Sequence, residues 1–164
     1  MSLKLERNFL DEKYFKEIKS KITSPYFPWY FQPNMTKGNY EWERPYFSHK
    51  IYDEFLPNSN FFDIFKPLLN KLEVKSLIRL TVNLNINFDE QYYSSWHTDQ
   101  QFPCKVAILY INTNNGFTEI KNDKKILKID CEENKIIMFD NHCQHRSVSQ
   151  TDHQRRIVIN LNYI

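Results

Sequence analysis

Residues 78–87 read IRLTVNLNIN, and this stretch decides the fold class. Apolar side chains alternate with polar ones, which is the period of a β-strand with one buried face and one polar face. The apolar positions are Ile78, Leu80, Val82, Leu84 and Ile86. The polar positions are Arg79, Thr81, Asn83, Asn85 and Asn87. We expect the apolar face to pack against helices and the polar face to line a cavity or to meet solvent.

Helical patterns precede this strand, and further strand patterns follow it. Asp11 is predicted to be a helix N-cap, because apolar residues recur after it at helical spacing through Ile22. A second amphipathic pattern covers residues 61–72, where we expect Pro67 to kink or split the helix. Shorter strands are predicted at residues 105–112, 117–121, 125–129, 134–139 and 156–164.

Helices followed by many short antiparallel strands predict an α+β fold with a rolled double sheet. The 164 residues contain no visible repeat or linker, so we expect one domain over residues 1–164. Residues 1–74 form its helical and aromatic N-terminal part, and residues 75–164 form its β core. Within the core, the turn signal TNNG at residues 113–116 predicts a hairpin between the two strands that flank it.

The composition excludes several classes of protein. The net charge is +2, from 22 basic and 20 acidic residues without a basic stripe, which argues against a nucleic-acid partner. With only two glycines, Gly38 and Gly116, the sequence contains neither a GxGxxG turn nor a P-loop. Three cysteines without a CxxC motif argue against a disulfide framework and a structural zinc site. No apolar stretch suits a secretory signal or a membrane span, so we expect a cytoplasmic protein without a membrane partner.

The residues most suggestive of chemistry lie in the stretch WHTDQ, residues 96–100. If the stretch is extended, His97 and Asp99 point to the same side, because residues i and i+2 of a strand share a face. Such a pair can be a salt bridge, a catalytic dyad or two ligands of a metal site. The pair alone leaves these three interpretations open.

A third ligand would have to come from a distant segment, and FDNHCQHRS at residues 139–147 offers two histidines. His142 is expected in the turn after the preceding strand, and His145 opens the segment beyond it. Two histidines and one carboxylate with three open positions form the facial triad of non-haem Fe(II) oxygenases. A 2-oxo acid can chelate two of these positions and O2 can take the third, but the choice between His142 and His145 stays open.

An anionic co-substrate needs a cation, and the last predicted strand begins with Arg155 and Arg156. Arginine suits bidentate binding of a carboxylate. Arg156 shares a face with Val158, Asn160 and Asn162, whereas Arg155 shares the more apolar face. The apolar face should pack outward against helices, so Arg156 is predicted to face the cavity. Tyr110 could add a hydroxyl to the same carboxylate.

Together these motifs resemble the 2-oxoglutarate- and Fe(II)-dependent dioxygenases, in the prolyl 4-hydroxylase-like branch. The resemblance lies in the order HxD, a strand that ends Tyr-x-Asn (110–112), a glycine-containing turn, a distal histidine, and an arginine that leads a last strand ending in tyrosine. Residues 139–163 are especially similar to small members from phages and marine bacteria. The resemblance covers roughly residues 75–164, with support from YFPWYFQP upstream.

The resemblance implies a double-stranded β-helix, or jelly roll, with supporting N-terminal helices. It implies Fe(II) bound by His97, Asp99 and His145, and 2-oxoglutarate bound by Arg156 and Tyr110. O2 would be the second co-substrate, and the resemblance is also compatible with ascorbate as an additional cofactor. Asp99 is present where halogenating members carry a small residue, so hydroxylation of an aliphatic C–H is expected.

The expected substrate is a prolyl residue in a protein or peptide, with a free amino acid or another small metabolite as the second choice. Asn162 stands where the nucleic-acid demethylase branch has a second arginine, which argues against demethylation. The alternative of another class is a non-catalytic, metal-binding jelly-roll module. The sequence does not fix the oligomeric state.

Overall fold

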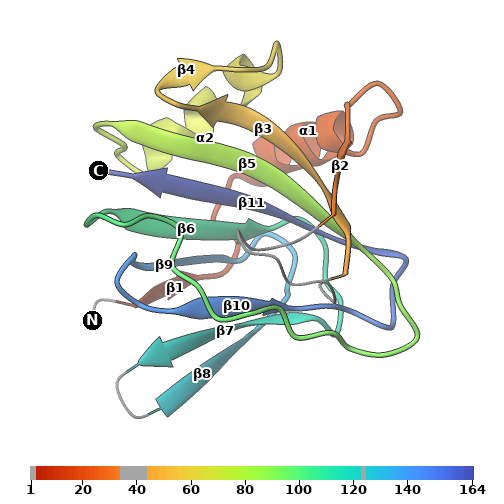
Figure 1. Ribbon diagram of the computed structural model, residues 1–164. Helices are drawn as coiled ribbons and strands as arrows, with labels where there is room; N and C mark the ends of the chain where they lie inside the picture. Colours follow the sequence, from red (N-terminus) through yellow and green to blue (C-terminus); the bar gives the residue numbers. More distant parts are fainter. Residues whose placement is uncertain (1–2, 34–43, 123–124) are drawn as a thin grey trace.

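The computed structural model describes residues 3–33, 44–122 and 125–164, and within them the strands form two antiparallel sheets (Figure 1). The large sheet has the order β1-β9-β6-β11-β5-β3-β2, with β4 paired to β3. Its strands are β1 (Lys4–Glu6), β2 (Tyr30–Gln32), β3 (Tyr46–Asp53), β4 (Leu56–Pro57), β5 (Leu77–Ile86), β6 (Lys105–Tyr110), β9 (Ile136–Asp140) and β11 (Arg155–Tyr163). The small sheet has the order β10-β7-β8. Its strands are β7 (Phe117–Asn122), β8 (Lys125–Asp130) and β10 (His145–Val148).

The helices form where the sequence predicts them. Asp11 caps α1 (Glu12–Ile22), because its Oδ1 accepts hydrogen bonds from the backbone N–H groups of the first turn. The second pattern is split into a 3-10 helix, η1 (Phe62–Phe65), and α2 (Lys66–Lys71). Pro67 stands in the first turn of α2, where its missing N–H leaves no hydrogen bond unmade. None of the described helices is long and apolar enough to cross a membrane.

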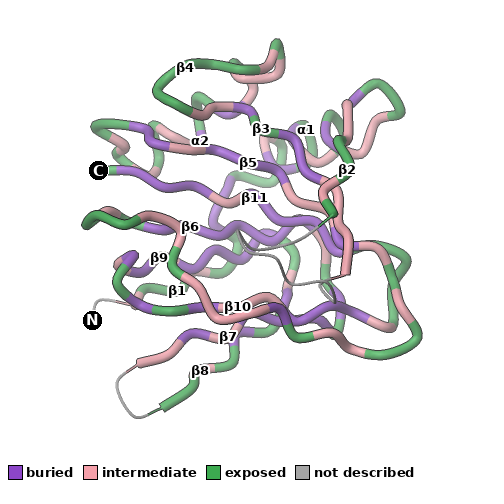
Figure 2. Tube along the Cα trace, in the orientation of Figure 1, coloured by how far each residue is buried: buried purple, intermediate pink, exposed green. Residues whose placement is uncertain are grey.

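The central strands of the large sheet are largely buried, as the mostly purple course of β5, β11 and β6 in Figure 2 shows. The first face of this sheet packs against α1 and α2. The buried side chains of this layer include Ile18, Ile22, Leu68, Leu80, Val82, Ile159 and Leu161. The second face packs against the small sheet through Val106, Ile108, Tyr110, Ile120, Ile129 and Val158. The predicted alternation is therefore confirmed for Leu80, Val82 and Leu84, whereas Ile78 is skipped at a β-bulge, where Leu77 joins the first layer instead. The polar positions of β5 lie on the face that looks toward the small sheet.

The predicted hairpin at residues 113–116 is wrong, because β6 and β7 belong to different sheets. β6 pairs with β9 and β11, whereas β7 pairs with β8 and β10. Asn114 closes the turn with its own side chain: Oδ1 accepts from Gly116 N at 3.0 Å, and Nδ2 donates to Asn112 O at 3.1 Å. A Cβ on Gly116 would lie 2.9 Å from the backbone oxygen of Val148 and 2.9 Å from Arg156 Cδ, so glycine is required by this close approach to the backbone.

Three further features concern single elements or residues. β7 and β8 pair in antiparallel register, and residues 123–124 between them lie outside the described residues. Cys104, Cys131 and Cys143 are free thiols, and Cys131 and Cys143 are buried. His49 is a packing residue of β3, because its buried ring lies against Phe27, and burial lowers its pKa.

Candidate functional site

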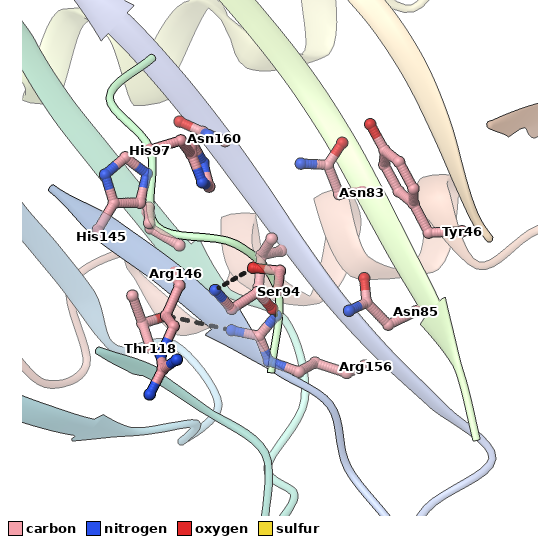
Figure 3. A pocket seen from close by; sticks show the side chains of 13 residues that line it. Tyr46, Asn83, Asn85, Ser94, His97, Thr118, His145, Arg146, Arg156 and Asn160 are labelled. Carbon is pink, nitrogen blue, oxygen red and sulfur yellow. Dashed lines mark hydrogen bonds between the residues drawn. The ribbon is translucent and has the colours of Figure 1, made fainter. Parts of the chain in front are cut away.

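His97 and His145 come together through an isolated antiparallel bridge between two segments that are distant in sequence. His97 N donates to His145 O at 3.1 Å, and His145 N donates to His97 O at 2.9 Å. These two hydrogen bonds fix the positions of both Cα atoms, from which the side chains project. The centroids of the two imidazole rings lie 4.5 Å apart. Figure 3 shows the two imidazoles next to each other at one end of a cavity. The bridge places both rings where one metal ion could contact them.

Asp99 does not lie in a strand with His97, so the predicted extended pair is wrong. It belongs to the loop after the bridge, and Asn141 binds the backbone of that loop. Asn141 Oδ1 accepts from Asp99 N at 3.0 Å and from Gln100 N at 3.1 Å. Asn141 Nδ2 donates to Gln100 O at 2.7 Å and to Phe102 O at 3.2 Å. The buried side-chain amide of Asn141 therefore makes the backbone hydrogen bonds that a neighbouring strand would otherwise make. These bonds hold the loop that carries Asp99 in place.

The side chains of His97, Asp99 and His145 converge on one point. Their ligand atoms lie within 4.8 Å of one another, the only such His, Cys, Asp or Glu group of three or more found in the described residues. Asp99 Oδ1 is 3.9 Å from His97 Nε2 and 3.8 Å from His145 Nε2. His142 is exposed and lies outside this group. The geometry thus favours His145 over His142 as the third ligand.

Burial and the charges around Asp99 set the protonation states of Asp99 and His145, and these are the states that metal binding needs. Burial alone would raise the pKa of Asp99, but the charge of Arg79 and the neighbouring imidazoles hold it well below its usual range. Burial lowers the pKa of His145 to about 4, although the charge of Asp99 opposes this shift. At neutral pH the carboxylate is therefore ionised and the buried imidazole is neutral, as metal ligands must be.

The carboxylate of Asp99 is also oriented by two amides of β11. Asn162 Nδ2 donates to Asp99 Oδ2 at 2.8 Å, and Asn160 Nδ2 donates to the same atom at 3.2 Å. The other oxygen, Oδ1, forms an ion pair with Arg79, whose Nη2 lies 2.9 Å away. Oδ1 is the oxygen that faces the two histidines. One oxygen of this buried carboxylate is thus hydrogen-bonded and the other is ion-paired, which keeps the direction of the carboxylate fixed.

Arg156 supplies a buried cation at a different part of the same cavity. Its side chain is 2% exposed, and its Nη1 donates to Ser147 Oγ at 2.9 Å. Its Nη2 donates to Thr118 Oγ1 at 3.1 Å, as Figure 3 shows. No Asp or Glu of the described residues forms an ion pair with it. A buried guanidinium without a carboxylate partner among the described residues is suited to an anionic ligand, whereas its neighbour Arg155 is exposed.

Tyr110 lies behind this cation and does not line the cavity. Its hydroxyl donates to Thr118 Oγ1 at 2.8 Å, and burial raises its pKa. Thr118 Oγ1 therefore accepts two hydrogen bonds, one from Tyr110 and one from Arg156. A hydroxyl has two acceptor positions and one hydrogen, so the Thr118 hydrogen is left to donate into the cavity.

The cavity connects the histidine pair with the cation. Its lining includes His97, His145, Thr118, Ser147, Arg156, Val158 and Asn160. The β3 and β5 side adds Tyr46, Asn83 and Asn85, which Figure 3 places on the opposite side of β11 from the histidines. The cavity can therefore hold a small anion between a metal ion at the histidine pair and the guanidinium of Arg156.

Several residues of the site are absent from the sequence predictions. The strand alternation already places Asn160 and Asn162 on the face of Arg156, and it places Arg79 on the polar face of β5. The register then sets Arg79 opposite Asn162, so a sheet pairing would have found both. Asn141 carries no comparable signal, because its contacts with the loop span 39 to 42 residues.

Comparison with known proteins shows relatives in structure only. No protein-family model matches the sequence, and no curated protein matches it. Among solved structures, a 2OG-Fe(II) oxygenase family oxidoreductase from Burkholderia pseudomallei superimposes with a TM-score of 0.77 at 10% identity, covering 98% of this chain and 84% of that one.

Two further structures are similar over almost the whole chain. A prolyl hydroxylase from Trichoplax adhaerens, in complex with a peptide fragment of a hypoxia-inducible factor, has a TM-score of 0.72 at 15% identity and covers 99% of this chain and 83% of its own. The non-haem α-ketoglutarate-dependent epimerase SnoN from nogalamycin biosynthesis has a TM-score of 0.67 at 10% identity. The match covers 99% of this chain and 77% of the epimerase. At these identities the likeness establishes the fold, so the predicted jelly roll is confirmed.

Proposed function

We propose that this chain is an Fe(II)- and 2-oxoglutarate-dependent oxygenase that hydroxylates an aliphatic C–H. One observation carries the proposal: His97, His145 and the unpaired Arg156 open into the same cavity. With Asp99, the two histidines provide the donor set of a facial triad. Fe(II) bound there would supply the redox chemistry with O2. The overall reaction balances as 2-oxoglutarate, O2 and R–H giving succinate, CO2 and R–OH.

The chain's own residues divide the work of binding. Arg156 binds the distal carboxylate of 2-oxoglutarate, and Thr118 donates its free hydroxyl hydrogen to the same group. Tyr110 contributes through Thr118, whose oxygen it fixes by a hydrogen bond. Asn160 and Asn162 keep Asp99 turned toward the metal position. These contacts hold the co-substrate and the ligands in one orientation before the reaction begins.

For the substrate we propose a prolyl residue in a peptide or protein. A structural neighbour that is a prolyl hydroxylase binds a peptide fragment, which supports this choice. The second candidate is a free amino acid or another small metabolite. It is favoured by Asn83 and Asn85, whose amides add polar groups to the cavity wall beside Tyr46. The net charge of +2 gives no support for a nucleic-acid substrate.

The substrate can be identified by mass spectrometry after incubation with Fe(II) and 2-oxoglutarate in air. The panel contains proline-bearing peptides, free amino acids and methylated oligonucleotides, and a reaction without 2-oxoglutarate is the control. We expect proline-bearing peptides to gain one oxygen atom. Oxygen gained only by free amino acids would select the second candidate, and loss of methyl groups from the oligonucleotides would contradict both. If no compound changes while Fe(II) and 2-oxoglutarate bind, the chain is a binding module.

A further inference from the structure

The two oxygens of Asp99 have different surroundings. Oδ2 is occupied by the amides of Asn160 and Asn162. Oδ1 faces both imidazoles, yet it also forms an ion pair with Arg79, whose Nη2 lies 2.9 Å away. A guanidinium is thus bound to the oxygen that a metal ion would use.

Arg79 has no other acidic partner among the described residues. Its side chain is 25% exposed, against 4% for Asp99, and its Nε is buried without a hydrogen-bond partner in the described part of the chain. It projects from β5 directly opposite Asn162 of β11. The sheet register therefore holds Arg79 beside Asp99, while its partial exposure leaves the guanidinium room to move toward solvent.

The charge of Arg79 changes the balance of the site. The carboxylate of Asp99 alone carries one negative charge, which attracts a divalent cation. Arg79 cancels that charge, and it repels any cation that approaches Oδ1. Even with partial screening by solvent, a like charge within about 5 Å should weaken divalent-cation binding by roughly tenfold or more.

We propose that Arg79 competes with the divalent cation for Asp99 and makes retention of the metal depend on a bound dianion. The inference rests on the proposed function, which supplies 2-oxoglutarate as that dianion. Two negative charges entering the cavity offset the excess positive charge of Arg79 beside the metal. Arg156 is placed elsewhere in the cavity and does not contact Asp99. Metal and co-substrate should therefore bind with strong positive coupling, and Arg79 should be its source.

The test is a titration with Mn²⁺, carried out with and without 2-oxoglutarate. Binding is monitored by calorimetry or by the electron paramagnetic resonance signal of free Mn²⁺. Without 2-oxoglutarate, the Arg79→Gln variant should bind Mn²⁺ with a dissociation constant at least about tenfold lower than that of the wild type. The gain in affinity that 2-oxoglutarate gives the wild type should shrink in the variant. Arg79→Lys, which keeps the charge, should stay closer to the wild type.

Two further variants separate competition from mere support of the fold. Lys105→Gln removes a cation that is paired with Asp140 at 2.8 Å, and it should leave Mn²⁺ affinity unchanged. Asn162→Ala removes a hydrogen bond to Oδ2, and it should weaken Mn²⁺ binding, which is the opposite sign to Arg79→Gln. Weaker or unchanged binding by a folded Arg79→Gln variant would overturn the inference. A wild type that binds no Mn²⁺ even with 2-oxoglutarate would instead contradict the proposed function as well.

Discussion

Replacing Arg156 by alanine is expected to raise the dissociation constant for 2-oxoglutarate by about 10²-fold or more. The guanidinium is buried, it donates hydrogen bonds to the hydroxyls of Ser147 and Thr118, and it has no carboxylate partner among the described residues. A carboxylate bound to it would therefore make a charge-assisted contact away from water. The alanine variant loses that contact and leaves the ligand's carboxylate buried without a cation.

Arg155→Ala is the matched control, because Arg155 precedes Arg156 on the same strand but is exposed. It should change the dissociation constant little. Calorimetric titration of the Mn²⁺-loaded proteins with 2-oxoglutarate measures both, since Mn²⁺ takes the metal position without turnover. Arg156→Lys should keep part of the affinity, because lysine retains the charge but not the fork that arginine offers. Equal effects of the two alanine variants would contradict the inward placement of Arg156.

His145→Ala is expected to abolish binding of Fe²⁺ and Mn²⁺ at concentrations that saturate the wild type. Loss of a hydrogen-bond partner that supports a metal ligand typically costs 10–100-fold in affinity, and removal of a ligand should cost more. His145 Nε2 lies 3.8 Å from Asp99 Oδ1, and burial keeps its imidazole neutral by lowering its pKa. The variant should leave only His97 and Asp99, which are too few to hold the ion.

His142→Ala is the control for this prediction, because His142 stands three residues earlier in an exposed turn. It should bind Mn²⁺ as the wild type does. Titration of both proteins under the same conditions gives the comparison, and circular dichroism checks that each is folded. Loss of binding in His142→Ala with retention in His145→Ala would show that the third ligand is misassigned.

The features that could be predicted from the sequence are those that depend on local periodicity. The alternation along β5 and β11 gave the buried and polar faces, and it gave the inward direction of Arg156. The capping by Asp11 and the splitting of the second helix at Pro67 are also local effects, and the structure confirms both. In each case the residue type and its immediate neighbours decide the conformation.

The features that failed depend on contacts between distant segments. The TNNG turn has hairpin chemistry, but β6 finds its partners in β9 and β11, so the chain crosses to the other sheet. His97 and Asp99 read as a strand pair, but the loop that carries Asp99 is held by Asn141. The contact of Arg79 with Asp99 likewise follows from sheet register and not from any motif.

Formation of succinate from 2-oxoglutarate is the most direct test of the proposed activity. The Fe(II)-loaded wild type is incubated in air with 2-oxoglutarate and the substrate panel, and succinate is quantified against a protein-free reaction. We predict succinate formation that requires Fe(II), is stimulated by the true substrate and is absent in His145→Ala. If wild-type protein with bound Fe(II) and 2-oxoglutarate forms no succinate above the protein-free level with any compound of the panel, the chain is not a 2-oxoglutarate oxygenase for these substrate classes.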